Sequence, residues 1–117
     1  MQKSFDDVWN DVQSALSELS SIHTLVQKVK NDIISIEKDH IKVKSEKTKK
    51  IRKIPRSQFE RVWNSLVAQG FYISKNHQPY VHSQIICAIL SLLNYVEARQ
   101  NPLTLYLKKK EMKNEYS

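Results

Sequence analysis

The first third of the chain carries an apolar seam with a seven-residue repeat, and this seam restricts the fold more than any other feature. An apolar side chain occupies the first and fourth position of five consecutive heptads. Such a repeat keeps one stripe of an α-helix against a partner helix, as in a coiled coil. The ten seam residues are Phe5, Val8, Val12, Ala15, Leu19, Ile22, Val26, Val29, Ile33 and Ile36. They predict one long helix that associates with other helices.

The limits of this helix follow from its flanks. Ser4 can cap the start, and Asp7 lies near the positive helix end. The seam stops after Ile36, because His40 and Lys47 occupy the first position of the next two heptads. β-Branched residues at both core positions favour an assembly of more than two helices. The alternative is a helix that packs on the C-terminal region of its own chain.

Composition supports a helical, intracellular protein. One glycine and three prolines are few for a turn-rich all-β chain, so we expect helix to dominate. The single cysteine, Cys87, lies in an apolar run, which predicts a buried thiol in a reducing compartment. The N-terminus lacks a signal-peptide pattern, and no apolar run is long enough to span a membrane. We expect a cytoplasmic or nucleoid/nuclear location, without secretion or membrane attachment.

Positive charge is concentrated in one short segment. The net charge is +7, and residues 39–56 contribute +6 of it. The basic side chains are Lys42, Lys44, Lys47, Lys49, Lys50, Arg52, Lys53 and Arg56. Pro55 disfavours helix at the preceding residue. We therefore expect residues 41–56 to form a basic linker or a continuation of the helix beyond the seam.

Residues 57–108 have the pattern of a small α+β domain. Ser57 and Glu60 match a capping box, and the helix that they start is expected to end at Gly70. The elements expected next are a strand over 71–74, a central helix over 84–99, a strand over 103–107 and a charged tail over 109–117. This helix-strand-helix-strand order allows a winged-helix-like domain. The whole chain is thus predicted to be mainly α, with a coiled-coil helix over residues 1–40.

Catalytic patterns are missing from the sequence. A single glycine excludes a glycine-rich phosphate loop, and neither a serine nucleophile elbow nor paired carboxylates in an apolar setting occur. His77, His82 and Cys87 are the one grouping that could bind a metal, but they lack the two tight ligand pairs of zinc sites. We expect neither an enzyme nor a metal, cofactor or small-molecule substrate.

The basic segment is the best functional candidate. Its eight cations can neutralise several phosphates, which gives salt-dependent affinity for nucleic acid. Tyr72 and Tyr80, near Lys75, could stack on bases of a single strand. A solvated linker, an acidic protein partner and a membrane surface are the alternatives.

The sequence therefore predicts a non-enzymatic, oligomeric nucleic-acid-binding protein with a regulatory or maintenance role, and it favours DNA over RNA. The second hypothesis is a coiled-coil structural or adaptor protein.

Overall fold

The apolar seam folds as a short helix and two strands in the computed structural model, which describes residues 3–74 and 82–108. Helix α1 spans Phe5–Ser17, and strands β1 (Ser21–His23) and β2 (Lys30–Ile36) follow it. The coiled-coil helix predicted over residues 1–40 is therefore wrong, because the helix in this region has only 13 residues. The predicted cap at its start is confirmed, since the Asp7 amide donates to the Ser4 hydroxyl at 3.2 Å.

The seam residues pack inside their own chain. Phe5, Val8, Val12 and Ile22 are buried, Ala15, Val29, Ile33 and Ile36 are partly buried, and Leu19 and Val26 are exposed. The predicted oligomerisation surface is therefore wrong, because most of its side chains are covered by other parts of the chain.

A bulge in β2 explains why a strand shows helical spacing. In a regular strand, Ile33 and Ile36 would point to opposite faces, because side chains alternate with a period of two. The pairing register of β2 shifts between Ile33 and Ser35, and both isoleucines pair with buried residues of the next strand. The extra residue restores one common face. Apolar residues three apart therefore fit this bulged strand as well as a helix.

The turns between strands are formed almost without glycine. Lys28, Lys49 and Asn101 adopt φ values of 60°, 64° and 71°, a region that usually favours glycine. A shortage of glycine thus did not prevent a strand-rich fold. The described residues form seven strands and three helices, and the prediction of a mainly α chain is wrong.

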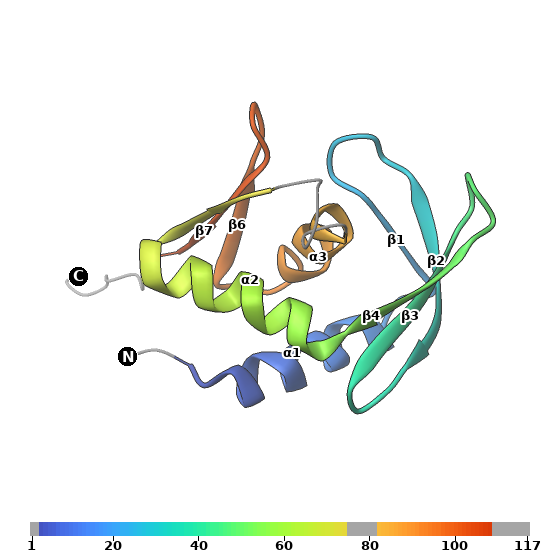
Figure 1. Cartoon of the computed structure of the whole chain (residues 1–117), viewed down its shortest axis with the longest axis horizontal. Coiled ribbons are helices and arrows are strands. Elements are labelled where there is room, and N and C mark those ends of the chain that lie inside the picture. Colours follow the sequence, from blue (N-terminus) through green and yellow to red (C-terminus); the bar gives the residue numbers. More distant parts are fainter. Residues whose placement is uncertain (1–2, 75–81, 109–117) are drawn as a thin grey trace.

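The basic segment belongs to a four-stranded antiparallel sheet. Its residues form β3 (His40–Ser45), β4 (Ile51–Pro55) and the turn between them, and the strand order is β1-β2-β3-β4 (Figure 1). The linker predicted over residues 41–56 is therefore wrong. Alternation explains the strands: Ile41, Val43 and Ile54 are buried, while the residues between them are polar.

The second half of the chain builds a three-stranded antiparallel sheet with order β5-β7-β6. Its elements are α2 (Arg56–Gln69), β5 (Phe71–Ile73), α3 (Ser83–Leu90), β6 (Val96–Arg99) and β7 (Thr104–Leu107). The predicted end of α2 is confirmed, because Gly70 is a left-handed cap with φ 84°. The predicted capping box is wrong, because α2 starts after Pro55 without a side-chain cap bond.

Helix α3 lies in the middle of the molecule, as expected, but it is shorter than predicted. It ends at Leu90, and the predicted helical residues 96–99 instead pair with β7. Figure 1 shows α3 between the two sheets, and its residues from Ile85 to Leu90 are all buried. A winged-helix reader needs an exposed helix to enter a groove. The buried α3 offers no such helix, so the winged-helix-like domain that the element order allowed is wrong.

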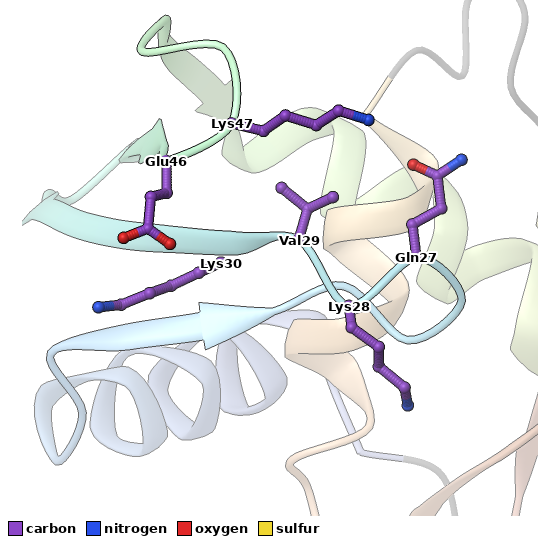
Figure 2. A pocket seen from close by; sticks show the side chains of 6 residues that line it. All are labelled: Gln27, Lys28, Val29, Lys30, Glu46 and Lys47. Atoms are coloured by element: carbon purple, nitrogen blue, oxygen red, sulfur yellow. The ribbon is translucent and has the colours of Figure 1, made fainter.

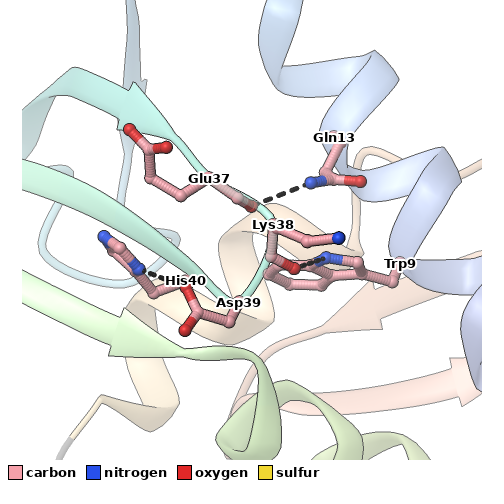
Figure 3. Close-up of polar contacts among 6 residues, drawn as sticks. All are labelled: Trp9, Gln13, Glu37, Lys38, Asp39 and His40. Atoms are coloured by element: carbon pink, nitrogen blue, oxygen red, sulfur yellow. Dashed lines mark hydrogen bonds and ion pairs between the residues drawn. The ribbon is translucent and has the colours of Figure 1, made fainter.

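Trp9 joins the helices to the four-stranded sheet. Its ring packs edge-on against Phe59 of α2 with 5.2 Å between centroids. Its indole nitrogen donates a 2.9 Å hydrogen bond to the Lys38 carbonyl in the β2–β3 turn. Gln13, one turn further along α1, donates to the Glu37 carbonyl at 2.8 Å (Figure 3). Together these contacts fix one end of the β2–β3 hairpin on α1.

We expect Trp9→Phe to lower the free energy of unfolding more than Trp63→Phe does. Both changes shrink a buried ring, but only the first removes a hydrogen bond to a described residue. The difference should be about 1 kcal/mol, the usual net value of one hydrogen bond. Urea denaturation followed by circular dichroism measures it. Equal losses in the two variants would show that the Lys38 bond does not hold the turn.

Candidate nucleic-acid interface

The cationic hairpin, residues 40–55, ends in a well-ordered turn. The Lys49 amide donates to the Ser45 carbonyl at 2.7 Å, and the Ser45 amide donates to the Lys50 carbonyl at 3.0 Å. Lys49 takes the left-handed position that closes the turn. The Glu46 amide donates to the Lys30 carbonyl of β2 at 2.9 Å. The turn thus has a defined conformation and a fixed place beside β2.

Strand alternation sorts the cations of the hairpin by face. Lys42, Lys44 and Lys53 lie on the outer face of the four-stranded sheet, opposite to the buried residues of the same strands. Lys42 pairs directly with Lys53 across β3 and β4. Like charges in such a pair repel each other. The outer face therefore carries three lysines, and Asp32 of β2, which pairs with Lys44 in the register, is a carboxylate on the same face.

The other predicted cations divide into three groups. Lys47, Lys49 and Lys50 are exposed at the tip of the hairpin. Arg52 pairs with Val43, so it lies on the inner face of the sheet. Arg56 forms an ion pair with Asp6 and lies over the Phe5 ring, with 5.1 Å from the guanidinium carbon to the centroid. Arg56 is thus committed to holding α1 and does not belong to the site.

The seven remaining cations of the hairpin lack ion-pair partners within residues 3–74 and 82–108. The pKa of nearby Asp39 is lowered mainly by its 2.7 Å hydrogen bond with His40 and least by the charge of Lys53. Glu46 is the single acidic residue of the hairpin. The excess of positive charge is therefore a property of the folded surface as well as of the sequence, and Asp32, which faces Lys44 from β2, offsets part of it.

A hollow beside the tip extends this surface. It has a volume of about 520 Å³ and lies between the β1–β2 loop and the hairpin. Figure 2 shows Lys47 reaching from the tip towards Gln27, with Lys28 and Lys30 on the lower side. The sequence did not predict that Lys30 belongs to this surface. Its side-chain nitrogen lies 4.0 Å from a carboxylate oxygen of Asp32. No local signal marks Lys30, because only the pairing of β2 with β3 brings it near the hairpin.

The predicted aromatic stacking residues do not join the site. Tyr72 is only 2% exposed, and its hydroxyl lies 3.0 Å from the Ser83 hydroxyl, so the stacking prediction for Tyr72 is wrong. Lys75 and Tyr80 lie outside the described residues. Phe71 is 39% exposed, but it belongs to the other sheet, on the far side of α3 from the hairpin (Figure 1).

The structure describes only two of the three residues that could bind a metal according to the sequence, His82 and Cys87. The third, His77, lies outside the described residues. Within residues 3–74 and 82–108, no group of three His, Cys, Asp or Glu side chains could hold a metal ion. Cys87 is fully buried on α3. Burial raises the pKa of its thiol to about 12, despite opposing hydrogen bonds from Ser74 and Ser83. This environment suits a core residue rather than a nucleophile.

No protein-family model, curated protein or solved structure matches the chain. In the described part of the chain, every helix is too short or too polar to cross a membrane. The case for a function therefore rests on the arrangement of the hairpin's side chains.

We expect Cys87 to resist alkylation while the protein is folded. At pH 8 a thiol with a pKa near 12 is almost entirely protonated, and the side chain is inaccessible. Mass spectrometry after brief iodoacetamide treatment should find unmodified native protein and full modification in urea. Rapid labelling of the native protein would show that α3 is exposed in solution.

Lys49→Gly should stabilise the protein by up to about 1 kcal/mol, because glycine adopts the left-handed conformation without the steric cost of a side chain. Lys50→Gly is the matched control, since it removes the same charge from the next residue, which has no positive φ. That change should destabilise by roughly 0.5–1 kcal/mol. Thermal unfolding at one fixed pH compares them, and equal destabilisation would contradict the assigned turn.

Proposed function

We propose that this protein binds nucleic acid, DNA in preference to RNA, through the outer face and tip of the cationic hairpin. The observation that carries the proposal is a cluster of six cations on the outer face and tip, none of which forms an ion pair within the described residues: Lys42, Lys44, Lys47, Lys49, Lys50 and Lys53. The role we assign is non-enzymatic and regulatory or related to nucleic-acid maintenance.

The spacing of the cations suits a phosphate backbone. Residues two apart on one strand, such as Lys42 and Lys44, are separated by about 6.8 Å. Successive phosphates of one DNA strand rise by about 3.4 Å along the helix axis and also turn about it, so neighbouring phosphates lie further apart than this rise, at a distance of the same order as the lysine spacing. A flexible linker would present no such fixed interval.

The shape of the hairpin favours duplex DNA. A two-stranded β-ribbon fits the major groove of B-DNA, whereas the major groove of an RNA helix is too narrow for side chains to read. Because β3 also pairs with β2, only the tip of the hairpin can enter such a groove as a two-stranded ribbon. The hairpin tip lies at one end of the long axis of the molecule, where a groove can approach it (Figure 1). The ribbon carries no Asn or Gln to read adenine, and its one arginine, Arg52, is turned inward. We therefore propose binding with little sequence preference.

The salt dependence of binding tests this proposal. Fluorescence anisotropy with a labelled random 20-base-pair duplex should give a log–log slope of about −4 to −5, if most of the six cations contact phosphates. Changing Lys47, Lys49 and Lys50 to Gln should weaken binding and reduce the slope by roughly 2 to 3. Changing Lys42, Lys44 and Lys53 to Gln should have a similar effect.

The matched control removes three exposed charges elsewhere, through Lys38→Gln, Arg61→Gln and Lys108→Gln. This variant has the same net charge as the two hairpin variants, so it separates position from total charge. It should keep more of the wild-type slope than either of them. Equal slopes in all three variants, or no binding to duplex DNA at low salt, would contradict the proposal.

A further inference from the structure

A second hollow, which we call the inner cleft, lies on the opposite side of the hairpin from the outer face. It has a volume of about 300 Å³ and is bounded by the β1–β2 loop, the hairpin tip, β4 and the start of α3. The side chains that matter most are Thr24, Gln27, Lys47, Thr48, Arg52 and Gln84. Four separate elements thus contribute polar groups to one small space. These residues are far apart in the sequence, so no local sequence pattern predicts the cleft.

Among the residues that the structure describes, two cations but no carboxylate line the inner cleft. Arg52 is turned towards it by the strand register, and Lys47 approaches from the tip. Neither forms an ion pair within the described residues. The pKa of His82, at the start of α3, is lowered first by burial and then by the Arg52 charge. The guanidinium is therefore held close to the first turn of α3 without an anion to balance it.

The two threonine hydroxyls have donor capacity to spare. The Thr24 hydroxyl accepts a 2.9 Å hydrogen bond from the Val29 amide, and the Thr48 hydroxyl accepts a 3.3 Å bond from the Lys50 amide. Accepting these bonds does not use the O–H of either threonine, so each hydroxyl can still donate to a ligand. Gln27 and Gln84 add side-chain amides at either side. The cleft is therefore rich in donors as well as positively charged.

We propose that the inner cleft binds a phosphate group, with Arg52 as its main ligand and Lys47, Thr24 and Thr48 as further donors. Arg52 can offer two parallel N–H groups to two phosphate oxygens, which a lysine cannot do. The start of α3 adds the positive end of a helix dipole. The phosphate can belong to a mononucleotide or to a nucleic-acid strand that also touches the tip. This site is on the other side of the hairpin from the outer-face cations Lys42, Lys44 and Lys53 and does not depend on them, and Lys47 is the one cation that belongs both to this site and to the proposed duplex-binding surface.

Titration of the full chain with inorganic phosphate, followed by amide chemical shifts at constant ionic strength, tests the cleft. Shifts should concentrate at Thr24, Thr48 and Gln84 and saturate at millimolar phosphate. Arg52→Gln should weaken binding about tenfold, Arg52→Lys by less, and Lys47→Gln several-fold. Arg61→Gln, which removes an exposed guanidinium from α2 away from the cleft, should leave phosphate affinity unchanged.

Two further binding measurements, with adenosine monophosphate and with an oligonucleotide, identify the source of the phosphate. Equal affinity for inorganic phosphate and adenosine monophosphate assigns the site to the phosphate group alone, and tighter nucleotide binding assigns it to a nucleotide. Loss of oligonucleotide affinity in Arg52→Gln assigns it to a strand. The proposal is overturned if no saturable shifts occur, or if Arg61→Gln weakens phosphate binding as much as Arg52→Gln and Lys47→Gln do. Because Lys47 is an exposed residue of the tip, its variant keeps the test valid if Arg52→Gln does not fold.

Discussion

The packing of Trp9 on Phe59, with its hydrogen bond to the Lys38 carbonyl, is the contact on which the arrangement of the hairpin depends. It fixes the β2–β3 turn on α1, and the Arg56 amide secures the same turn by donating to the Asp39 carbonyl at 2.8 Å. With this end fixed, the register of the sheet is fixed as well. A slip of one residue would turn the lysines of β3 into the core.

Burial on one face of the hairpin is strong enough to maintain repulsion on the other. Ile41, Val43 and Ile54 are fully buried, and each contributes roughly 1.5–3 kcal/mol by leaving water. The facing pair of Lys42 and Lys53 costs roughly 0.2–1 kcal/mol at the surface. The fold therefore tolerates a concentration of positive charge that would not persist in a marginally stable ribbon. A polyanion would relieve the repulsion and add its own attraction.

Local signals in the sequence predicted some elements correctly, and pairing between distant residues decided the others. The cap at Ser4 and the end of α2 at Gly70 depend on neighbouring residues, so both could be predicted. The seam could not be interpreted correctly, because a bulge at Ile34 gives a strand the apolar spacing of a helix. Lys28 and Lys49 take the turn positions expected of glycine, so composition understated the number of strands.

The charge of the sequence alone identified the basic segment, but it could not predict how the segment folds. As a linker, its cations would be equivalent and mobile, and each would lose conformational freedom on binding a phosphate. In the sheet they are divided between an outer face, a tip and an inner cleft, while Arg56 is withdrawn into an ion pair with Asp6. The backbone entropy is then lost during folding and not during binding. Such a preformed array can bind a polyanion with fewer contacts than a disordered segment of equal charge, because less of the binding energy is used to order the chain.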